Sequence, residues 1–363
     1  MRRPDVFKKG WGKHLRILSL ESSCDETAAA VVSFSETERS ILSSAIASQV
    51  EIHALYGGVV PEIAGRAHIE AISGLVYRAL EEAGISADEL DAVAVTSEPG
   101  LIGALLVAVN FAKAFAFAHR LPLIPVNHIR GHVAAAYFAY PDLKAPFFAM
   151  VASGGHTSLI DVRSPVEFVT VGKTRDDAIG EAFDKVARVL GMPYPGGAEI
   201  DRLASRGDPD AIAFPSAALR GSLDFSFSGL KTAVINYVHG ARQRGALPEL
   251  PAGGGEGADK AVADIAASFT AAVVRAVISH LEKAHARFGY KTLVAAGGVA
   301  ANSHLRSALT VFCEKQEIRL CLPPLSLCGD NAAMIGAQGY YEFMAGHLAG
   351  SDLNARPTVR GAD

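Results

Sequence analysis

Apolar and polar positions alternate along the first third of the chain with the periods of strands and helices. An apolar run at residues 15–21 is followed by the polar turn SSCDET and a second apolar run, which predicts a hairpin with polar residues at its tip. Residues 61–83 carry apolar side chains three and four positions apart, a pattern typical of an amphipathic helix. Residues 91–100 predict a buried strand ending in a turn, and a long apolar helix begins after Gly100. This alternation favours a layered α/β fold.

The second part of the chain repeats the pattern. Residues 147–162 predict another apolar hairpin, with Gly154 and Gly155 at its turn. We therefore expect two related halves around a cleft. The elements predicted after this hairpin are a helix at 176–192, a glycine-rich turn at 194–204, a flexible proline- and glycine-rich insertion at 247–259, a long helix at 259–288, and a strand that ends at Gly297-Gly298 and opens a helix.

Composition supports a globular protein of two domains, since the chain has 363 residues and 50% hydrophobic content. The longest apolar stretch, 101–118, contains Asn110 and Lys113, so we interpret it as a buried helix and not as a membrane span. No secretory signal is visible near the N-terminus. Cysteines 24, 313, 321 and 328 form no C-x-x-C pair. Reduced thiols and the missing signal predict a cytoplasmic location.

The net charge of −4 gives no global attraction for nucleic acid, so any RNA contact must be local. Basic residues concentrate only in the first sixteen positions. This segment is interpreted as a solvated, poorly ordered tail in preference to an RNA-binding arm.

His128 and His132 are the most informative pair for chemistry. Their H-x-x-x-H spacing places two imidazoles on one helix face, one turn apart, where they can hold a metal ion. Asp330, in a short polar turn between apolar runs, is the best candidate for a third ligand. The spacing alone also arises by accident in a chain with 12 histidines.

Three turns that follow strands, at 22–27, 153–157 and 296–302, could converge on one nucleotide. Each alone could equally be an ordinary tight turn. There is no G-x-x-x-x-G-K-[ST] loop and no G-x-G-x-x-G fingerprint, which argues against P-loop and dinucleotide-binding proteins.

Several carboxylates are candidates with two interpretations. Asp184, with Lys185 beside it, and Asp201 could bind sugar or substrate hydroxyls, or could be surface carboxylates of helices. Asp25 and Glu26 at the first hairpin tip could hold a metal-bound water, orient phosphate or act as a base. They could also simply cap their own turn.

Nine motifs occur in order between Glu21 and Gly336. They are ESSCDET, GGVVPEIAGRAH, NHIRGH, ASGGHTSL, GEAFDKVARVLG, YPGG, DFSFSGLKT, AAGGVAANSHLR and CGDNAAMIG. Together they resemble the tRNA N6-adenosine threonylcarbamoyltransferase family, once described as O-sialoglycoprotein endopeptidases. The resemblance covers nearly the whole chain, apart from the N-terminal extension and the final tail.

The resemblance implies the two-lobed, actin-like ATPase fold of the sugar kinases and Hsp70, with a duplicated mixed sheet and flanking helices. The expected first lobe is 15–127, completed by a helix at about 330–348, and the expected second lobe is 128–329. Residues 1–14 would be a disordered extension and 349–363 a tail.

The resemblance also implies a reaction. Threonylcarbamoyl passes from threonylcarbamoyl-AMP to N6 of adenosine 37, just 3′ of the anticodon, in tRNAs that read codons starting with A. His128, His132 and Asp330 would hold one divalent metal ion, Fe²⁺ or alternatively Zn²⁺. The residues that would bind the adenylate are Val151, Ala152, Ser153, Gly154, Gly155, Asp184, Gly197, Asp201 and Asn302. We expect Asp25 or Glu26 to be catalytic, by positioning the substrate or accepting a proton.

The partners implied are tRNA, a shorter inactive paralogue bound through the N-terminal lobe, and a P-loop ATPase, while a separate synthase supplies the adenylate; no membrane is involved. The chain departs from the family pattern at Glu98, where the usual turn is G-P-G, and at Asn127, which replaces a His. Glu98 either puts in doubt the close backbone approach expected at that turn or is a neutral surface substitution, which is the interpretation we favour.

Two other functions are less well supported by the sequence. A metallopeptidase is disfavoured because Ile129 occupies the place of the general-base Glu in H-E-x-x-H. A kinase of small sugars or acids is suggested by the fold alone.

Overall fold

The computed structural model describes residues 14–35, 37–219, 221–245, 247 and 260–357. Residues 1–13 of the basic N-terminal segment and nearly all of the insertion predicted at 247–259 lie outside these residues, whereas Leu15 and Arg16 at the end of that segment begin a strand. The chain divides into two compact units. Of the described residues, unit 1 contains those within 14–47, 61–143 and 331–357, and unit 2 contains those within 48–60 and 144–330.

Unit 1 is built on a five-stranded mixed sheet. Strand β1 pairs antiparallel with β2, with Leu15 opposite Phe34, and parallel with β4, which in turn pairs parallel with β5. The predicted first hairpin is therefore confirmed. In sheet order the strands are β3 (Arg39–Ser48), β2 (Glu26–Phe34), β1 (Leu15–Glu21), β4 (Ala92–Glu98) and β5 (Leu123–Asn127).

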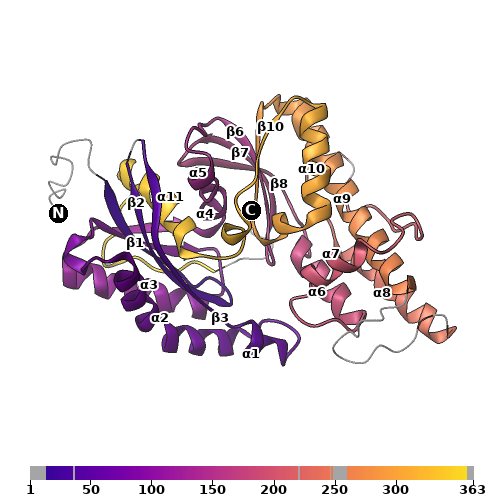
Figure 1. Ribbon diagram of the computed structural model, residues 1–363, viewed down its shortest axis with the longest axis horizontal. Coiled ribbons are helices and arrows are strands. Elements are labelled where there is room, and N and C mark those ends of the chain that lie inside the picture. Colours follow the sequence, from indigo (N-terminus) through magenta and orange to yellow (C-terminus); the bar gives the residue numbers. More distant parts are fainter. Residues whose placement is uncertain (1–13, 36, 220, 246, 248–259, 358–363) are drawn as a thin grey trace. The chain divides into compact units, whose positions relative to one another are not determined.

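Helices cover both faces of this sheet (Figure 1). On one face, α2 (Pro61–Ala83) and α3 (Ile102–His119) pack on alternate residues of the central strands, including Leu18 and Val93. On the other face lies α11 (Ala332–Met344), where a Cβ at Gly336 would come within 2.5 Å of Val32 Cγ2. Glycine fits there because the helix backbone packs closely on the side chains of Val32 and Ser19. The 3₁₀ turn η2 (Ala87–Glu89) leads into β4.

The sheet of unit 2 repeats the arrangement. Its central strand β6 pairs antiparallel with β7 and parallel with β9, as β1 does with β2 and β4. The shared pattern of strand pairing in the two sheets confirms the prediction of two related halves. In sheet order the strands are β10 (Arg319–Cys321), β9 (Thr292–Ala296), β6 (Phe147–Ala152), β7 (Thr157–Ser164) and β8 (Glu167–Lys173).

The core of unit 2 gathers around α9, which contributes a long row of buried apolar residues. The helical elements of this unit are α1 (Val50–Ala54), α6 (Ile179–Val189), α7 (Gly197–Ala204), α8 (Ser228–Gln243), α9 (Lys260–Phe288), η3 (Gly298–Ala301), α10 (Ser303–Lys315) and η4 (Leu325–Leu327). The predicted turn at 194–204 is wrong beyond Gly196, because Ile200 and Leu203 are buried on one face of α7. Packing against α9 makes this segment helical.

The units differ from the lobes expected from the sequence at two places. Residues 128–143, with α4 (His128–Ala134) and α5 (Ala136–Ala139), belong to unit 1, because α4 packs against α11. Residues 48–60 belong to unit 2 although they follow β3.

Two helices, α3 and α9, are long and apolar enough to cross a membrane by length and composition alone. Two thirds of the most apolar window of α9 is buried inside the protein, 67%. In α3, Leu105 and Val109 face the sheet of unit 1. Packing thus accounts for most of the apolar window of α9 and for a third of that of α3, of which 33% is buried.

Candidate functional site

Two histidines and an aspartate meet at the start of α4. Asn127 caps this helix, since its Oδ1 accepts hydrogen bonds from the N–H groups of Ile129 at 3.0 Å and Arg130 at 3.2 Å. The cap begins the helix at His128, so His128 and His132 lie one turn apart with ring centroids separated by 4.6 Å. The local sequence therefore accounts for the predicted pair.

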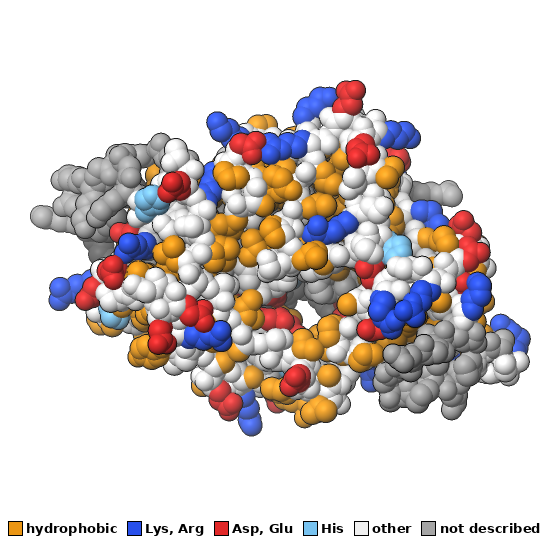
Figure 2. All heavy atoms as spheres, in the orientation of Figure 1, with side chains coloured by type: hydrophobic (Ala, Val, Ile, Leu, Met, Phe, Trp, Pro, Cys, Tyr) orange, Lys and Arg blue, Asp and Glu red, His pale blue; other side chains and the backbone are white. Residues whose placement is uncertain are grey.

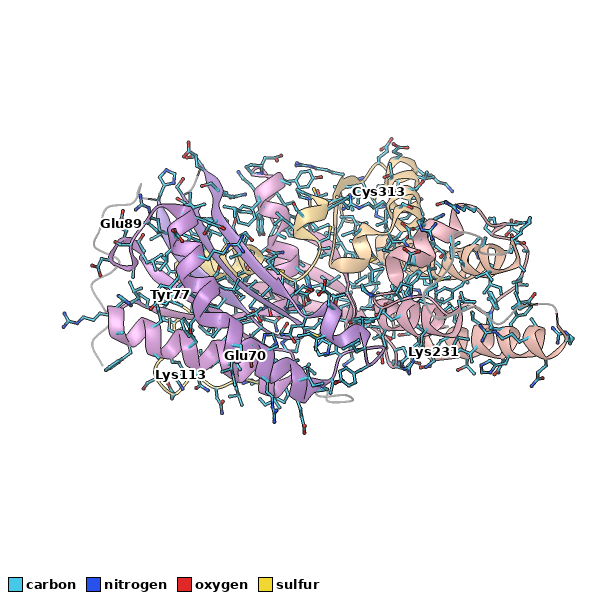
Figure 3. The ribbon with its side chains drawn as sticks, turned by 60° about the horizontal axis from the view of Figure 1, so that its bottom comes forward. Glu70, Tyr77, Glu89, Lys113, Lys231 and Cys313 are labelled. Carbon is cyan, nitrogen blue, oxygen red and sulfur yellow. The ribbon has the colours of Figure 1, made fainter. Side chains whose placement is uncertain are left out.

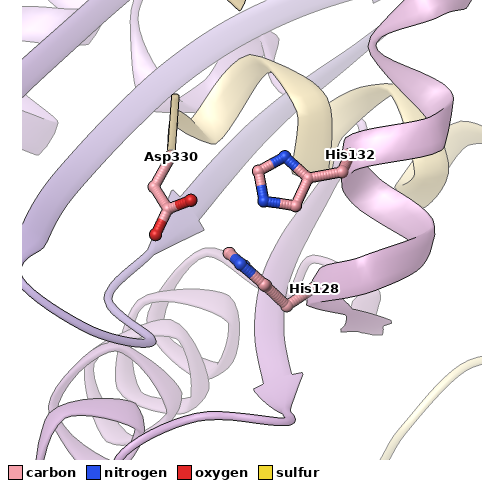
Figure 4. A group of neighbouring side chains, drawn as sticks. All are labelled: His128, His132 and Asp330. Atoms are coloured by element: carbon pink, nitrogen blue, oxygen red, sulfur yellow. The ribbon is translucent and has the colours of Figure 1, made fainter. Parts of the chain in front are cut away.

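Asp330 joins this pair from a distant part of the chain. It directly precedes Asn331, whose side chain accepts a hydrogen bond from the Met334 N–H and caps α11. Because α11 packs on α4, the cap brings Asp330 to the histidines. One ligand atom from each of His128, His132 and Asp330 lies within 4.8 Å of the others, and the three side chains converge in Figure 4.

The donor set fits a divalent transition metal. Two imidazole nitrogens and one carboxylate suit iron or zinc, and three protein ligands leave coordination positions open. Both histidines are buried, with 4% and 0% of the surface of His128 and His132 exposed. Buried, convergent donors of this kind are those that a metal ion requires.

Glu21 contacts the candidate metal group, which we define as His128, His132 and Asp330, and no sequence pattern singled it out. Its fully buried carboxylate accepts hydrogen bonds from His128 Nδ1 at 2.9 Å, Thr96 Oγ1 at 2.7 Å and the Ser23 N–H at 2.5 Å. With Nδ1 engaged, His128 would have Nε2 available to hold a metal. The available signal was a lone carboxylate that ends the apolar strand LRILSLE.

The first hairpin tip is tied down close to His128. Ser23 Oγ lies 3.1 Å from His128 Nδ1, and the Ser23 carbonyl accepts the Leu101 N–H at 2.8 Å. Asp25 is buried and Glu26, the first residue of β2, is partly exposed. Within the described residues, the metal-competent group contains neither of them.

The second site is a cavity of about 500 Å³ in unit 2. Of the nine residues expected to bind the adenylate, five line it: Gly154, Asp184, Gly197, Asp201 and Asn302. Val151 and Ala152 are instead fully buried inside β6. Ser153 and Gly155 also lie outside the lining, and Ser153 Oγ accepts the His156 N–H at 3.2 Å.

Helix N-termini define the cavity wall. The Gly196 N–H donates to Asp184 Oδ1 at 2.8 Å, which fixes the start of α7. Gly180, near the start of α6, approaches the turn after β6 so closely that a Cβ there would lie 2.7 Å from Gly154 Cα. Backbone N–H groups at helix N-termini favour an anionic ligand such as a nucleotide phosphate.

Asp201 links α7 to α10. Its carboxylate accepts the Ser303 N–H at 2.9 Å and lies 2.7 Å from His304 Nδ1. Burial raises the pKa of Asp201, but hydrogen bonds from His304 and Ser303 outweigh this effect and keep the pKa below its usual value. Lys185 does not line the cavity and instead forms 2.8 Å ion pairs with Asp177 and Glu181.

The two departures from the family pattern are neighbours in the sheet. Glu98 lies opposite Asn127 in the pairing of β4 with β5, and Asn127 Nδ2 is 3.5 Å from Glu98 Oε1. Glu98 also lies 3.6 Å from Arg356. A close backbone approach occurs two residues later, where a Cβ on Gly100 would lie 2.6 Å from the Ser23 carbonyl oxygen.

Solved structures share the fold at low sequence identity. HypF of T. kodakarensis is similar to this chain with a TM-score of 0.61 and 12% identity, over 94% of this chain and 49% of HypF. Component A of the Acidaminococcus fermentans (R)-2-hydroxyglutaryl-CoA dehydratase has a TM-score of 0.52 and 16% identity, over 91% and 99% of the two chains. These similarities confirm the class, the two-lobed actin-like ATPase fold with a mixed sheet in each lobe.

Sequence comparison gives the family. The model of the tRNA N6-adenosine threonylcarbamoyltransferase family matches residues 40–337. Relatives with that name are 51% identical in Halalkalibacterium halodurans, over 94% of this chain and 95% of the relative, and 50% identical in Listeria monocytogenes, over 95% and 96%. The chain belongs to the tRNA N6-adenosine threonylcarbamoyltransferase family.

Proposed function

We propose that this protein transfers threonylcarbamoyl from threonylcarbamoyl-AMP to N6 of adenosine 37 in tRNAs that read codons starting with A, and releases AMP. Membership of the family is the observation that carries the proposal. The cavity of unit 2 supports the proposal, because five of the residues expected to bind the adenylate line this one cavity. Asp184, Asp201 and Asn302 are polar side chains in that lining, and we propose that they contact the nucleotide.

Attack by an exocyclic amine on a carbamoyl carbon demands mainly positioning and stabilisation of charge. We propose that His128, His132 and Asp330 hold one divalent metal ion, Fe²⁺ or alternatively Zn²⁺, which supplies a Lewis acid. Glu21 orients His128 for this task. The helix N-termini at the cavity would hold the anionic AMP portion.

Asp25 and Glu26 remain the proposed catalytic carboxylates. The amine must lose a proton as the new bond forms, and a carboxylate can accept it. Support comes from the hairpin tip, whose Ser23 lies beside His128. If Asp25→Ala and Glu26→Ala each retain full transfer activity, the assignment is to be abandoned.

tRNA is the substrate that the family implies, and the charge of this chain affects how it binds. The net charge is −4, and acidic and basic side chains are interspersed over the face shown in Figure 2. We propose that partner proteins supply part of the tRNA-binding charge. These are the shorter inactive paralogue and the P-loop ATPase, with the adenylate made by a separate synthase, all in the cytoplasm.

The exposed face of α2 is proposed to receive the paralogue. Ile69 and Tyr77 are 64% and 73% exposed on this helix, and Figure 3 shows Tyr77 with Glu70 on α2. Large apolar side chains in such exposed positions are typical of a protein interface.

The test is mass-spectrometric nucleoside analysis of tRNA incubated with the protein, its partners and threonylcarbamoyl-AMP. A His128→Ala, His132→Ala double variant is compared with His239→Ala, which changes an exposed histidine of α8. We expect the modified adenosine with the wild type and the control, and none with the double variant. Absence of product from metal-loaded wild type would refute the proposal and favour either a paralogue that binds without turnover or a kinase. An assay of ATP-dependent phosphorylation would distinguish these two.

A further inference from the structure

Arg306, on the first turns of α10, makes hydrogen bonds in two directions. Its Nε–H donates to the Ala300 carbonyl at 2.6 Å, and its Nη2–H donates to the Pro323 carbonyl at 2.9 Å. The same Nη2 lies 3.4 Å from the sulfur of Cys328. One half-buried guanidinium thus binds two separate chain segments.

The first segment is the wall of the nucleotide cavity. Ala300 lies in η3, and the residues on both sides of it, Val299 and Ala301, line the cavity. Asn302 follows in the same wall and caps α10 through the Leu305 N–H at 2.9 Å. The position of η3 therefore affects the shape of the cavity.

The second segment leads to the metal group. Pro323 begins a short irregular stretch that runs through η4 and Cys328 to Asp330. The Cys328 thiol lies 3.7 Å from the Pro323 carbonyl and 3.5 Å from that of Pro324, so sulfur, guanidinium and carbonyls form one cluster. This cluster fixes the stretch two residues before Asp330.

Arginine suits this task for a geometric reason. Its planar group presents five N–H donors at fixed directions, so it can serve acceptors in different segments at once. A lysine ammonium is a point charge on a flexible stem and cannot reproduce both directions. Loss of the guanidinium would also leave two carbonyls in a mostly buried cluster without this donor.

We propose that Arg306 is a positioning residue that couples the adenylate cavity to the metal group, by holding η3 and the stretch before Asp330 in a fixed relation. The inference rests on the proposed function for the identity of the ligands, and its contacts involve neither ligand directly. A single substitution should therefore weaken two binding events whose residues are far apart in the sequence.

The experiment measures AMP binding by calorimetry and Zn²⁺ binding by competition with a chromophoric chelator, in the full chain. We expect Arg306→Ala to weaken each about tenfold, in line with the loss of residues that orient ligands. Arg306→Lys should restore neither the affinity for AMP nor the affinity for Zn²⁺. Millimolar guanidinium should recover part of each affinity in Arg306→Ala, which an overall loss of fold would not allow. Lys315→Ala, an exposed cation near the end of the same helix, is the control.

The outcomes are distinct. If Arg306→Ala is folded by circular dichroism and binds AMP and Zn²⁺ as tightly as wild type, the coupling is refuted. If only one affinity falls, Arg306 supports one site and the coupling is likewise refuted. If wild type binds both ligands but transfers nothing to tRNA, the proposed function fails while the two binding measurements still decide the role of Arg306.

Discussion

The carboxylate of Glu21 offers a sharp test of how the metal group is built. Three donors converge on it: Ser23 N–H on Oε1, and Thr96 Oγ1 and His128 Nδ1 on Oε2. Glu21→Gln keeps the size of the side chain and replaces one acceptor oxygen by an NH₂ group. Either orientation of the amide then places a donor against a donor.

The consequence differs between the two orientations. With NH₂ toward Ser23, a buried N–H loses its acceptor, which costs about 1–3 kcal/mol of stability. With NH₂ toward His128, Nδ1 must accept, so the proton moves to Nε2, the nitrogen left for the metal. We therefore expect Zn²⁺ affinity to fall about 10–100-fold. That loss corresponds to about 1.4–2.8 kcal/mol.

The assay is chelator competition on metal-free protein, with the thermal midpoint measured in parallel. Glu70→Gln, an exposed carboxylate on α2, serves as the matched control. Zn²⁺ affinity of Glu21→Gln within twofold of wild type would show that Glu21 does not orient His128, and the reasoning would be wrong.

Three further predictions concern packing, pH and metal removal. Gly196→Ala, whose new Cβ would lie 2.0 Å from Ala187 Cβ, should lose about 1–3 kcal/mol of stability in urea unfolding and weaken AMP binding. Gly197→Ala, which has open space, should keep its stability, and equal midpoints for both variants would refute the packing argument. Burial raises the pKa of Asp177, but hydrogen bonds from Lys185 and Lys231 keep the pKa below its usual 3.8. A carboxyl group whose pKa is lower in the folded state stabilises the fold above pH 3.8. This contribution is lost as the pH falls through the lowered, folded-state pKa. Asp177→Asn should therefore be less stable than wild type at pH 7, and the gap should close below about pH 3.8; a gap independent of pH would contradict this. Finally, Zn²⁺ should raise the thermal midpoint of chelator-treated wild type and leave that of the His128→Ala, His132→Ala variant unchanged, whereas equal shifts would place the metal elsewhere.

Local patterns predicted much of the fold. The hairpins at 15–34 and 147–164, the helix at 61–83 and the long helix ending at 288 are all present, because their apolar periodicity is set by neighbours in the sequence. The turn prediction is wrong for 197–204, since the glycines at 196 and 197 indicate a turn while burial against α9 makes the segment a helix.

The candidate site residues also divide into those that local sequence spacing predicts and those that only tertiary contacts bring together. The spacing of His128 and His132 is local, and a helix of one turn suffices to pair them. The addition of Asp330 and Glu21 to that pair depends on α11 and β1, which contact α4 and His128 only after the chain has folded. Neither contact has a sequence period that reveals it.

The sequence by itself determined the strands, most helices, the histidine pair and the family resemblance, because each depends on residues near one another or on motifs in order. Only the tertiary structure decided that Glu21 holds His128, that Asp184 fixes the start of α7, and that Arg306 binds both η3 and the stretch before Asp330. These contacts join distant segments, and their geometry follows from how helices and sheets pack, which no local pattern encodes.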